Sequence, residues 1–379
     1  MQFDLLVVGA SFAGIACARE AALAGQRVCV LDRKAHPGAR LHTTGLLVRE
    51  VAEIGWLRAM PATLTRPIGG VCVYAPSLRH VRLAAPGYHF LATDTGGVLR
   101  WLSGQATRVG VVFCWGTALS SLTRDAHGWT ANRWLRARYV VGADGAHSKV
   151  ARLCGLSGNT EFLAGVELEF AGGRLHDPDA LHCLVDRRLA PGYIGWAFEG
   201  VAGLQLGIAR RHARGSAPDV GALLDRFAPL VRGRTAQPSG TRAGMIPCGG
   251  VLPRVFGDRV LLVGDAAGLV SPLTAGGIHT ALRYGSMAGT AAAQWLRGSA
   301  PQPAETLRGR YPRFVLKRAL RWAFDRFQSD RITEWALGSD LARATVGRLY
   351  FHRRSVAGDV IAAPQATRPT ETVQADRAR

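Results

Sequence analysis

The stretch VLLVGDAAGLVSPLTAGGIHTAL, which spans Val260–Leu282, decides the fold of this 379-residue chain. Its apolar start predicts a short buried strand over Val260–Val263. Gly264-Asp265 and a turn-rich loop follow, and a helix of small residues begins after Ala275-Gly276-Gly277-Ile278. Such a loop offers a carboxylate that accepts hydrogen bonds from hydroxyl groups, and helix N–H groups that stabilise negative charge. These groups suit a flavin with its ribityl hydroxyls, although an ordinary α/β loop has the same spacing.

A second glycine-containing loop stands at the start of the chain. The apolar run Phe3–Val8 predicts a buried parallel strand, a helix is expected over Ile15–Ala24, and a strand over Val28–Leu31 ends at Asp32. In such a βαβ unit the helix N-terminus faces a pyrophosphate, and the acid after the second strand binds a ribose. Ser11 replaces the middle glycine of the usual pattern. The predicted dinucleotide-binding residues are Gly9, Ser11, Phe12, Ala13, Gly14, Asp32 and Arg33.

Composition argues against several classes of protein. No long uncharged apolar run occurs, so no membrane-spanning helix is expected, and the first strand begins too near Met1 to leave room for a secretion signal. Seven scattered cysteines predict a reducing cytoplasm, without disulfides or a zinc site. The net charge of +20 comes from dispersed arginines, so we expect attraction for anionic cofactors or surfaces and no nucleic acid partner.

The middle of the chain predicts a separate antiparallel sheet. Residues 69–90 alternate apolar and polar positions around a Pro-Ser turn, and residues 160–250 contain further alternating segments with a helix over Val220–Val231. We expect this sheet to cover the flavin. Its substrate-pocket candidates, which are otherwise a plain aromatic core, are Tyr193, Trp196 and Phe198. His42 is a further pocket candidate, or else a merely polar loop residue.

A third motif, YVVGADGAHSKVAR over Tyr139–Arg152, predicts a buried strand that ends at Gly142-Ala-Asp144-Gly145 and is followed by a helix. The three motifs in this order resemble those of the flavoprotein superfamily of single-component aromatic hydroxylases and geranylgeranyl reductases. The resemblance covers about residues 1–300 and implies bound FAD, with NADPH or NADH as a transient reductant. It places Asp144 and Gly145 near the pyrophosphate, and Gly264 and Asp265 on the ribityl chain and pyrophosphate. The positions that it implies beside the ring are Pro272, Gly276, Gly277 and Ile278.

Two features are closer to the geranylgeranyl reductases than to the hydroxylases. Gly268 stands where the hydroxylases usually carry histidine, and Pro191–Phe198 (PGYIGWAF) is similar to the reductases' Tyr-x-Trp-x-Phe motif with one extra residue. Two other features depart from the reductases: His42-Thr43-Thr44 replaces their cysteine, and their usual arginine before the central strands is Thr95. Two basic residues remain as candidates for holding the FAD, Arg40 and Arg100.

The predicted fold is therefore α/β, with a Rossmann-like FAD-binding domain (a parallel sheet with helices), an antiparallel-sheet substrate domain and C-terminal helices. Residues 1–68, 91–158 and 251–300 are assigned to the FAD-binding domain, and 69–90 and 159–250 to the substrate domain. Residues 301–350 are expected to form the helices, and 351–379 a disordered tail.

The sequence predicts an FAD-dependent, NAD(P)H-linked oxidoreductase that acts on a hydrophobic small molecule. The flavin would carry the chemistry, because neither a Ser/His/Asp set nor a metal-ligand cluster is evident. The missing cysteine favours a monooxygenase. The alternative is geranylgeranyl-reductase-like reduction of carbon–carbon double bonds in an isoprenoid or lipid. A flavin halogenase and a non-enzymatic FAD-binding protein are the remaining interpretations, and no lysine stands out as a hypohalous acid relay among Lys34, Lys149 and Lys317.

The stretch Arg308–Gln328 predicts an amphipathic helix with an apolar and a basic face. The apolar face contains Leu316, Leu320, Ala323 and Phe327. The basic face contains Arg310, Arg313, Lys317 and Arg321. Such a helix can lie on an anionic bilayer, or it can pack its apolar face on the FAD-binding domain and leave the arginines in solvent. We therefore expect a cytoplasmic protein, with peripheral contact at the inner face of the membrane as one of these two outcomes.

Overall fold

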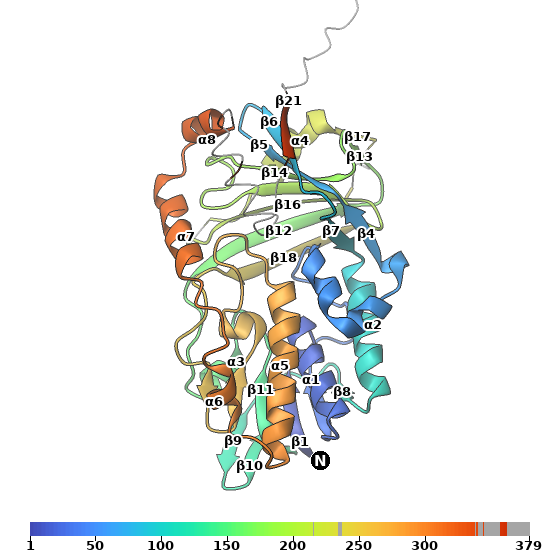
Figure 1. Ribbon diagram of the computed structural model, residues 1–379, viewed down its shortest axis with the longest axis vertical. Coiled ribbons are helices and arrows are strands. Elements are labelled where there is room, and N and C mark those ends of the chain that lie inside the picture. Colours follow the sequence, from blue (N-terminus) through green and yellow to red (C-terminus); the bar gives the residue numbers. More distant parts are fainter. Residues whose placement is uncertain (215, 234–236, 338, 340–343, 345–356, 362–379) are drawn as a thin grey trace, which may run out of the picture.

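A computed structural model of the chain describes residues 1–214, 216–233, 237–337, 339, 344 and 357–361. Figure 1 shows two parts along the long axis: a lower part built on a first β-sheet, and an upper part built on a second sheet. The N-terminus lies at the lower end. The predicted α/β fold, with a parallel and an antiparallel sheet, is confirmed.

The first sheet has the strand order β19-β20-β11-β1-β2-β8. Its parallel strands β1 (Gln2–Val8), β2 (Val28–Leu31), β11 (Leu135–Gly142) and β20 (Val260–Leu262) come from the three predicted motifs. The side chains of β1 from Leu5 to Val8 are buried on both faces, as expected for a parallel strand covered by other elements. The sheet is completed by β8 (Val112–Cys114), β9 (Leu122–Asp125), β10 (Gly128–Ala131) and β19 (Phe256–Gly257).

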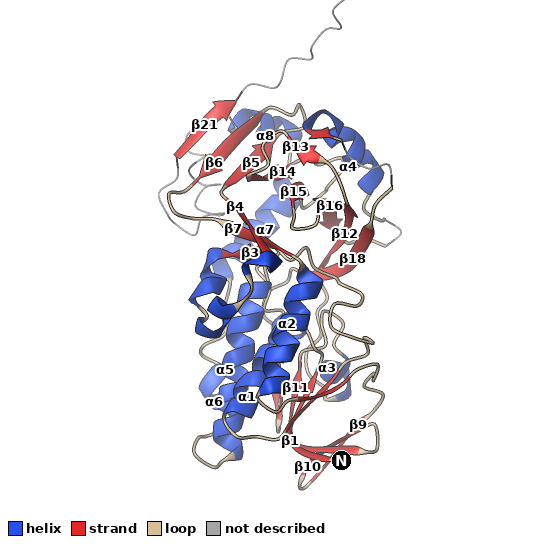
Figure 2. Ribbon diagram, turned by 90° about the vertical axis from the view of Figure 1, so that its right-hand side faces the viewer, coloured by secondary structure: helices blue, strands red, loops and turns tan. Residues whose placement is uncertain are grey.

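Three helices lie side by side against the first sheet: α1 (Phe12–Leu23), α2 (Thr95–Arg108) and α5 (Ile278–Leu296) (Figure 2). The contact between α1 and α5 is unusually close because α5 carries glycine where the helices meet. A Cβ atom at Gly285 would lie 2.3 Å from the carbonyl oxygen of Ala13, and one at Gly289 would lie 2.2 Å from that of Cys17. These glycines therefore determine how deeply α5 sits beside the first motif.

The second sheet has the order β18-β12-β16-β15-β14-β5-β6-β21 and is antiparallel except for the β14–β5 pair. Its strands are β5 (Gly70–Tyr74), β6 (His80–Ala84), β12 (Phe162–Phe170), β14 (Ala180–Leu184), β15 (Gly195–Glu199), β16 (Leu204–Arg211) and β18 (Gly240–Pro247). Because side chains alternate along β15, Trp196 and Phe198 lie on one face of the sheet, in a buried apolar cluster. Leu46, Val48 and Ala275 pack against this cluster. The opposite face packs against α4 (Val220–Phe227).

Several short elements complete the two parts. The third sheet joins β3 (Leu47–Val48), β7 (Phe90–Thr93) and β4 (Thr65–Ile68), and β13 (Arg174–Leu175) pairs with β17 (Val231–Arg232). Helix α3 (Lys149–Leu153) follows β11. The 3₁₀ helices are η1 (Arg49–Glu53), η2 (Gly55–Ala59), η3 (Ala62–Leu64), η4 (Ala228–Leu230) and η5 (Gly264–Ala267).

The C-terminal region differs from the prediction in several respects. The prediction of a single helix over Arg308–Gln328 is wrong for the first part of this stretch. Helix α6 (Pro303–Leu307) ends before Arg308, a loop follows, and α7 (Val315–Phe327) covers only the second part. The loop is fixed by Tyr311, whose hydroxyl donates to the Leu262 carbonyl at 3.0 Å, and it contains Pro312, which disfavours a helical residue before it. Helix α8 (Asp330–Ala336) follows.

Two other expectations for this region are corrected. Arg321, assigned to a solvent-exposed basic face, is only 3% exposed. Within the tail expected to be disordered, β21 (Ala357–Ile361) pairs with β6, and the rest of 351–379 lies outside the described residues. Among the helices that the structure describes, none is both long enough and apolar enough to span a bilayer.

The α1–α5 contact gives a direct stability test. Gly289→Ala forces a Cβ atom into the Cys17 carbonyl, so we expect it to lower the free energy of unfolding by about 1–3 kcal/mol, as overpacking does. Gly104→Ala in α2 is the matched control, because nothing lies within 4 Å of its added Cβ, and it should stabilise the protein by up to about 1 kcal/mol. Urea denaturation measures both, and equal stability of the two variants would contradict the proposed close contact.

Candidate functional site

The three motifs meet at one edge of the first sheet, where parallel strands β1, β11 and β20 end. A Cβ atom at Gly9 would lie 2.2 Å from the carbonyl oxygen of Ala143, so only glycine lets these two loops approach. Asn159 joins the other pair of loops, because its side-chain amide donates to the carbonyls of Ala146 at 3.0 Å and Asp265 at 2.9 Å. Asn159 was not among the predicted residues, because it follows α3 in an ordinary polar segment.

Asp32 lies next to the first glycine loop, as predicted. Its carboxylate accepts hydrogen bonds from the backbone N–H of Ala10 at 2.6 Å and of Lys34 at 2.8 Å, and it is 7% exposed. The acid thus holds the loop between β1 and α1 in position. Each carboxylate oxygen keeps a further lone pair, so the predicted contact with a ribose stays compatible with this arrangement.

Asp144 caps the helix that follows its own loop. Its carboxylate accepts hydrogen bonds from the Ser148 hydroxyl at 2.6 Å and from the backbone N–H groups of Lys149 at 2.6 Å and Val150 at 3.0 Å. These bonds cap the first turn of α3, whose orphan N–H groups need acceptors. Asp144 therefore shapes the second loop, and the contact of Asp144 and Gly145 with the cofactor stays a prediction.

Asp265 is the acid whose carboxylate has no hydrogen-bond partner within the part of the chain that the structure describes. It is half-buried on η5, and only its backbone carbonyl is engaged, by Gly268 N–H and Asn159. Burial raises its pKa to about 6, and no neighbouring donor opposes that shift. A desolvated carboxylate left without a donor is suited to accept hydroxyl hydrogens from a ligand.

The N-terminus of α5 lies beside this carboxylate. Gly277 caps the helix without a side-chain hydrogen bond, and a Cβ atom there would be 3.7 Å from an oxygen of Asp265. Ala275 adopts a left-handed conformation with φ of 51° just before the helix. The backbone N–H groups of Thr274 and Ala275 donate to Ser271, whereas the N–H groups of the first turn of α5 have no acceptor within the helix. Contact of this segment with the cofactor stays a prediction.

The basic residues predicted to contact FAD, Arg33, Arg40 and Arg100, have fewer contacts with the protein than the three acids described above. Arg100 reaches the turn of Gly38 and pairs with Asp94 at 3.7 Å, so it lies beside the segment that leads away from Asp32. Arg33 and Arg40 are exposed, and Arg40 is left-handed with φ of 47°. Arg100 is exposed as well, and of the two candidates for holding phosphate it is the one that forms an ion pair within the described residues.

The three aromatic pocket candidates lie on the same side of the second sheet, facing the first. Tyr193 donates its hydroxyl to the Thr274 carbonyl at 2.6 Å, so it ties this sheet to the loop before α5. Trp196 and Phe198 are buried in the cluster that contains Tyr193 and Ala275. His42 is exposed, with Nδ1 2.8 Å from the carbonyl oxygen of Ala243 on β18. The structure thus brings these four residues to the junction of the two sheets, and their pocket role stays a prediction.

Glu167 is a buried acid at this junction that was not predicted from the sequence. Glu167 lies opposite Arg242 on one neighbouring strand and Gly207 on the other, and Gly207 lies opposite Trp196. The Trp196 indole N–H donates to one oxygen of Glu167 at 2.8 Å, whereas the other oxygen makes no hydrogen bond and lies 3.5 Å from Arg242 Nη1.

Desolvation, only partly offset by Trp196 and Arg242, raises the pKa of Glu167 to about 7. Arg242 also donates to the carbonyls of Thr43 and Thr44 in the loop after Arg40. The alternation of β12 predicted the strand, but only the register across three strands brings these side chains together.

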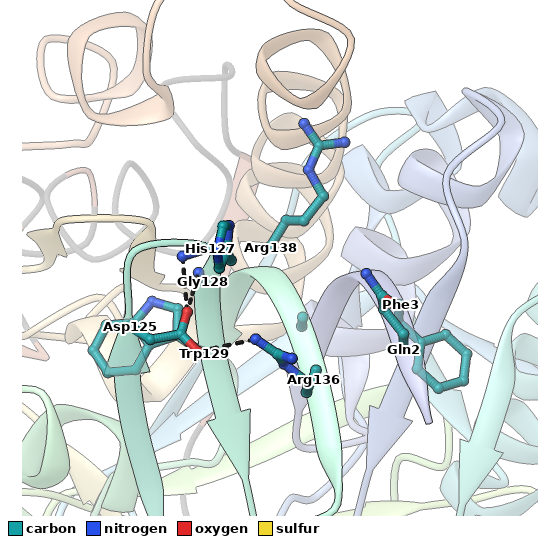
Figure 3. Close-up of a pocket in the computed structure, with 9 residues that line it drawn as sticks. Gln2, Phe3, Asp125, His127, Gly128, Trp129, Arg136 and Arg138 are labelled. Atoms are coloured by element: carbon teal, nitrogen blue, oxygen red, sulfur yellow. Dashed lines mark hydrogen bonds and ion pairs between the residues drawn. The ribbon is translucent and has the colours of Figure 1, made fainter.

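A separate depression lies at the opposite end of β1 from the glycine loop (Figure 3). It is lined by Gln2, Phe3, Asp125, His127, Gly128, Trp129, Arg136, Ala137 and Arg138. Asp125 is satisfied there by the backbone N–H groups of His127 and Gly128 and by Arg136 at 3.0 Å. Because it faces away from all three motifs, we do not assign it to the site.

Comparison with known proteins agrees with this geometry. A family model described as an FAD binding domain matches residues 2–194. Digeranylgeranylglycerophospholipid reductase 2 of Methanopyrus kandleri is 32% identical in an alignment over 316 residues, and the match covers 78% of each chain. The chain belongs to this family of FAD-dependent oxidoreductases.

Solved structures share the fold of this flavoprotein. A geranylgeranyl bacteriochlorophyll reductase-like protein of Thermoplasma acidophilum has a TM-score of 0.79 and 20% identity, over 93% of this chain and 97% of that one. PqsL of Pseudomonas aeruginosa, a probable FAD-dependent monooxygenase, has a TM-score of 0.65 and 21% identity, over 89% of this chain and 100% of that one. At these identities the likeness shows a common fold only.

The flavoprotein's own residues fit FAD. The carboxylate of Asp265, which has no hydrogen-bond partner among the described residues, provides an acceptor for hydroxyl groups, and the N-terminus of α5 provides donors for negative charge. The described residues contain no cluster of side chains suited to a metal ion. Gly268 is left-handed with φ of 69°, and a Cβ there would lie 2.2 Å from the Gly250 carbonyl, so a histidine cannot replace it.

Asp265 gives a test of the cofactor site. Asp265→Asn should weaken FAD binding roughly ten- to a hundredfold, equivalent to about 1.5–3 kcal/mol for a charge-assisted hydrogen bond. Folding raises the pKa of this acid, so its ionisation destabilises the folded apoprotein above its ordinary pKa, and the variant should be at least as stable at pH 7.5. Asp125→Asn, at the far end of the first sheet, is the matched control.

The wild-type affinity for FAD should also depend on pH. Because the ionised carboxylate is the better acceptor, affinity should fall about tenfold per pH unit below about pH 6, and this fall should be absent in Asp265→Asn. Fluorescence titration of apoprotein with FAD measures both effects. Unchanged affinity in a folded Asp265→Asn variant would show that the loop after β20 does not hold the ribityl chain.

Proposed function

We propose that this flavoprotein reduces carbon–carbon double bonds in an isoprenoid chain of a lipid. The observation that carries the proposal is the apolar, aromatic face of the second sheet, which lies directly over the loop from Thr274 to Ile278 and is tied to it by Tyr193. The names of the relatives, digeranylgeranylglycerophospholipid reductases, support this substrate class.

Binding of FAD is assigned to residues of the three loops. Asp32 would accept from the ribose and Asp265 from the ribityl hydroxyls, and the N-terminus of α5 would stabilise negative charge. When bound and reduced by NADPH or NADH, FAD supplies hydride equivalents. Arg100 is the residue we assign to the phosphates, because it is held between Gly38 and Asp94.

The substrate would be held by the facing aromatic residues. Burial of Trp196 and Phe198 excludes water from this side of the junction, and apolar surface favours an isoprenoid chain. A lipid substrate further implies that the protein works as a cytoplasmic enzyme in contact with the inner face of the membrane.

Addition of hydrogen across a double bond also needs a proton. Glu167 is the residue that we propose holds it, because it is buried at the junction and one of its oxygens makes no hydrogen bond within the described residues, lying 3.5 Å from Arg242. A pKa of about 7 leaves a large share of this carboxyl group protonated near neutral pH. The Trp196 indole fixes its orientation through the other oxygen.

Monooxygenation of a hydrophobic small molecule is the second candidate. The observation that favours it is the segment His42-Thr43-Thr44, which replaces the cysteine of the reductases and contacts β18. The shared fold with PqsL is compatible with this reaction.

Product analysis separates the two reactions. The holoprotein, NADPH and a geranylgeranylated phospholipid in detergent are incubated with and without oxygen, and the lipid is analysed by mass spectrometry. Reduction predicts that the lipid gains pairs of hydrogen atoms under both conditions. A product that gains oxygen atoms, and only in the presence of O₂, would establish monooxygenation instead.

Glu167 provides a pH test of the proposed reduction. The protonated acid is the active form, so the rate should fall about tenfold per unit as pH rises above about 7. Glu167→Gln keeps an acceptor for Trp196 but cannot transfer a proton, so its rate should be low and lack this pH dependence. FAD content and reduction by NADPH should stay at the wild-type level. A wild-type pH profile in Glu167→Gln would exclude this role.

A further inference from the structure

The C-terminal helices expose an apolar surface that the fold does not use. Seven of the thirteen large apolar side chains recorded as exposed in the described residues lie on α7 and α8. We call them the α7–α8 face: Val315, Leu316, Leu320, Trp322, Phe327, Ile332 and Trp335. Leu316 is 67% exposed, Trp322 65% and Trp335 74%. A concentration of this kind marks an interaction site more often than a solvated surface.

Helix α7 is amphipathic with the usual orientation reversed. Its inner side carries Arg321, which donates to the carbonyl of Gly192 and to Asp325, and Gln328, which accepts from the Gly192 N–H at 2.6 Å. Lys317 also lies on this half-buried side. Because polar hydrogen bonds attach the helix to the protein, its apolar residues are left facing outward.

Charge around the α7–α8 face is predominantly basic. Arg313, Arg318, Arg326 and Arg331 are exposed, and none has an acidic partner within the part of the chain that the structure describes. The nearby acids are already engaged: Asp325 by Arg321, Asp330 by the backbone N–H of Arg187, and Glu334 by Ser77. An apolar surface ringed by arginines is complementary to a bilayer with anionic headgroups.

The α7–α8 face lies close to the candidate pocket. The turn that receives Arg321 and Gln328 leads directly into Tyr193, whose hydroxyl reaches Thr274. The side chain of Arg318 lies beside Gly250, which in turn is close to Pro272. A chain that enters from this side therefore has a short route to the junction of the sheets.

We propose that the α7–α8 face docks the protein on the surface of an anionic lipid bilayer, with the aromatic and aliphatic side chains at the level of the headgroups. The inference deepens the proposed function, because it names the bilayer as the source of the lipid substrate. Binding of the protein to a bilayer depends only on the α7–α8 face, so it can be measured without catalytic turnover.

Flotation of the purified holoprotein with vesicles tests the proposal. Vesicles of phosphatidylglycerol and phosphatidylcholine, or of phosphatidylcholine alone, are used at low and high salt. The docking variant is Leu316→Asp/Trp322→Asp. The charge-matched control is Leu23→Asp/Val112→Asp, whose sites are exposed on the lower part. Thermal unfolding and FAD content confirm that each variant is folded.

The wild type and the control should float with anionic vesicles, less so at high salt, and the docking variant should partition at least about tenfold more weakly. Failure of the wild type to float, or equal flotation of the docking variant, would overturn the proposal. So would self-association in sedimentation that the docking variant abolishes, since the face would then join two copies of the chain. Reduction of detergent-dispersed lipid without flotation would leave the proposed function standing and remove only the docking.

Discussion

The close approach of backbone atoms at glycine positions is the constraint on which the rest of this structure depends. Gly9 allows the loop after β1 to contact the loop after β11, and Gly285 and Gly289 let α5 lie against α1. With these contacts in place, the parallel strands bring three acids to one edge of the sheet. Asp32 and Asp144 also hold their own loops through hydrogen bonds to the protein, whereas the carboxylate of Asp265 has no hydrogen-bond partner among the described residues.

Much of the fold could be predicted because the three motifs are local. Each combines an apolar strand, a loop with glycine and a helix start, and such signals lie within a few residues of one another. The use of Asp144 as a cap was less evident, because its acceptors depend on the exact path of the turn before α3. Glu167 was not predicted, because its partners come from strands that are distant in sequence and are set by register.

For helix α7, the sequence did not predict which side of the helix is buried. Its two faces were recognised from periodicity, but the pattern does not say which face turns inward. The orientation of α7 is set by the hydrogen bonds of Arg321 and Gln328 to the turn at Gly192. That turn precedes the helix by more than a hundred residues in the sequence. The side that carries Arg321 and Gln328 is therefore the buried one, contrary to the usual expectation that apolar residues cover the core, and Arg310 and Arg313 are exposed.

Taken together, these contacts connect the surface, the pocket and the cofactor loop through a single turn. The segment Ala190–Tyr193 receives α7 on one side and, through the Tyr193 hydroxyl, holds the loop before α5 on the other. This arrangement suits an enzyme whose substrate is drawn from a membrane.

Reoxidation of the reduced flavoprotein by lipid, without oxygen, tests the central claim most directly. Holoprotein reduced with NADPH is mixed anaerobically with a geranylgeranylated lipid or with its fully saturated counterpart, and the flavin absorbance is followed. If the flavoprotein reduces isoprenoid double bonds, the absorbance returns with the unsaturated lipid and stays bleached with the saturated one. Absorbance that returns with neither lipid, and only when oxygen is admitted, would contradict it.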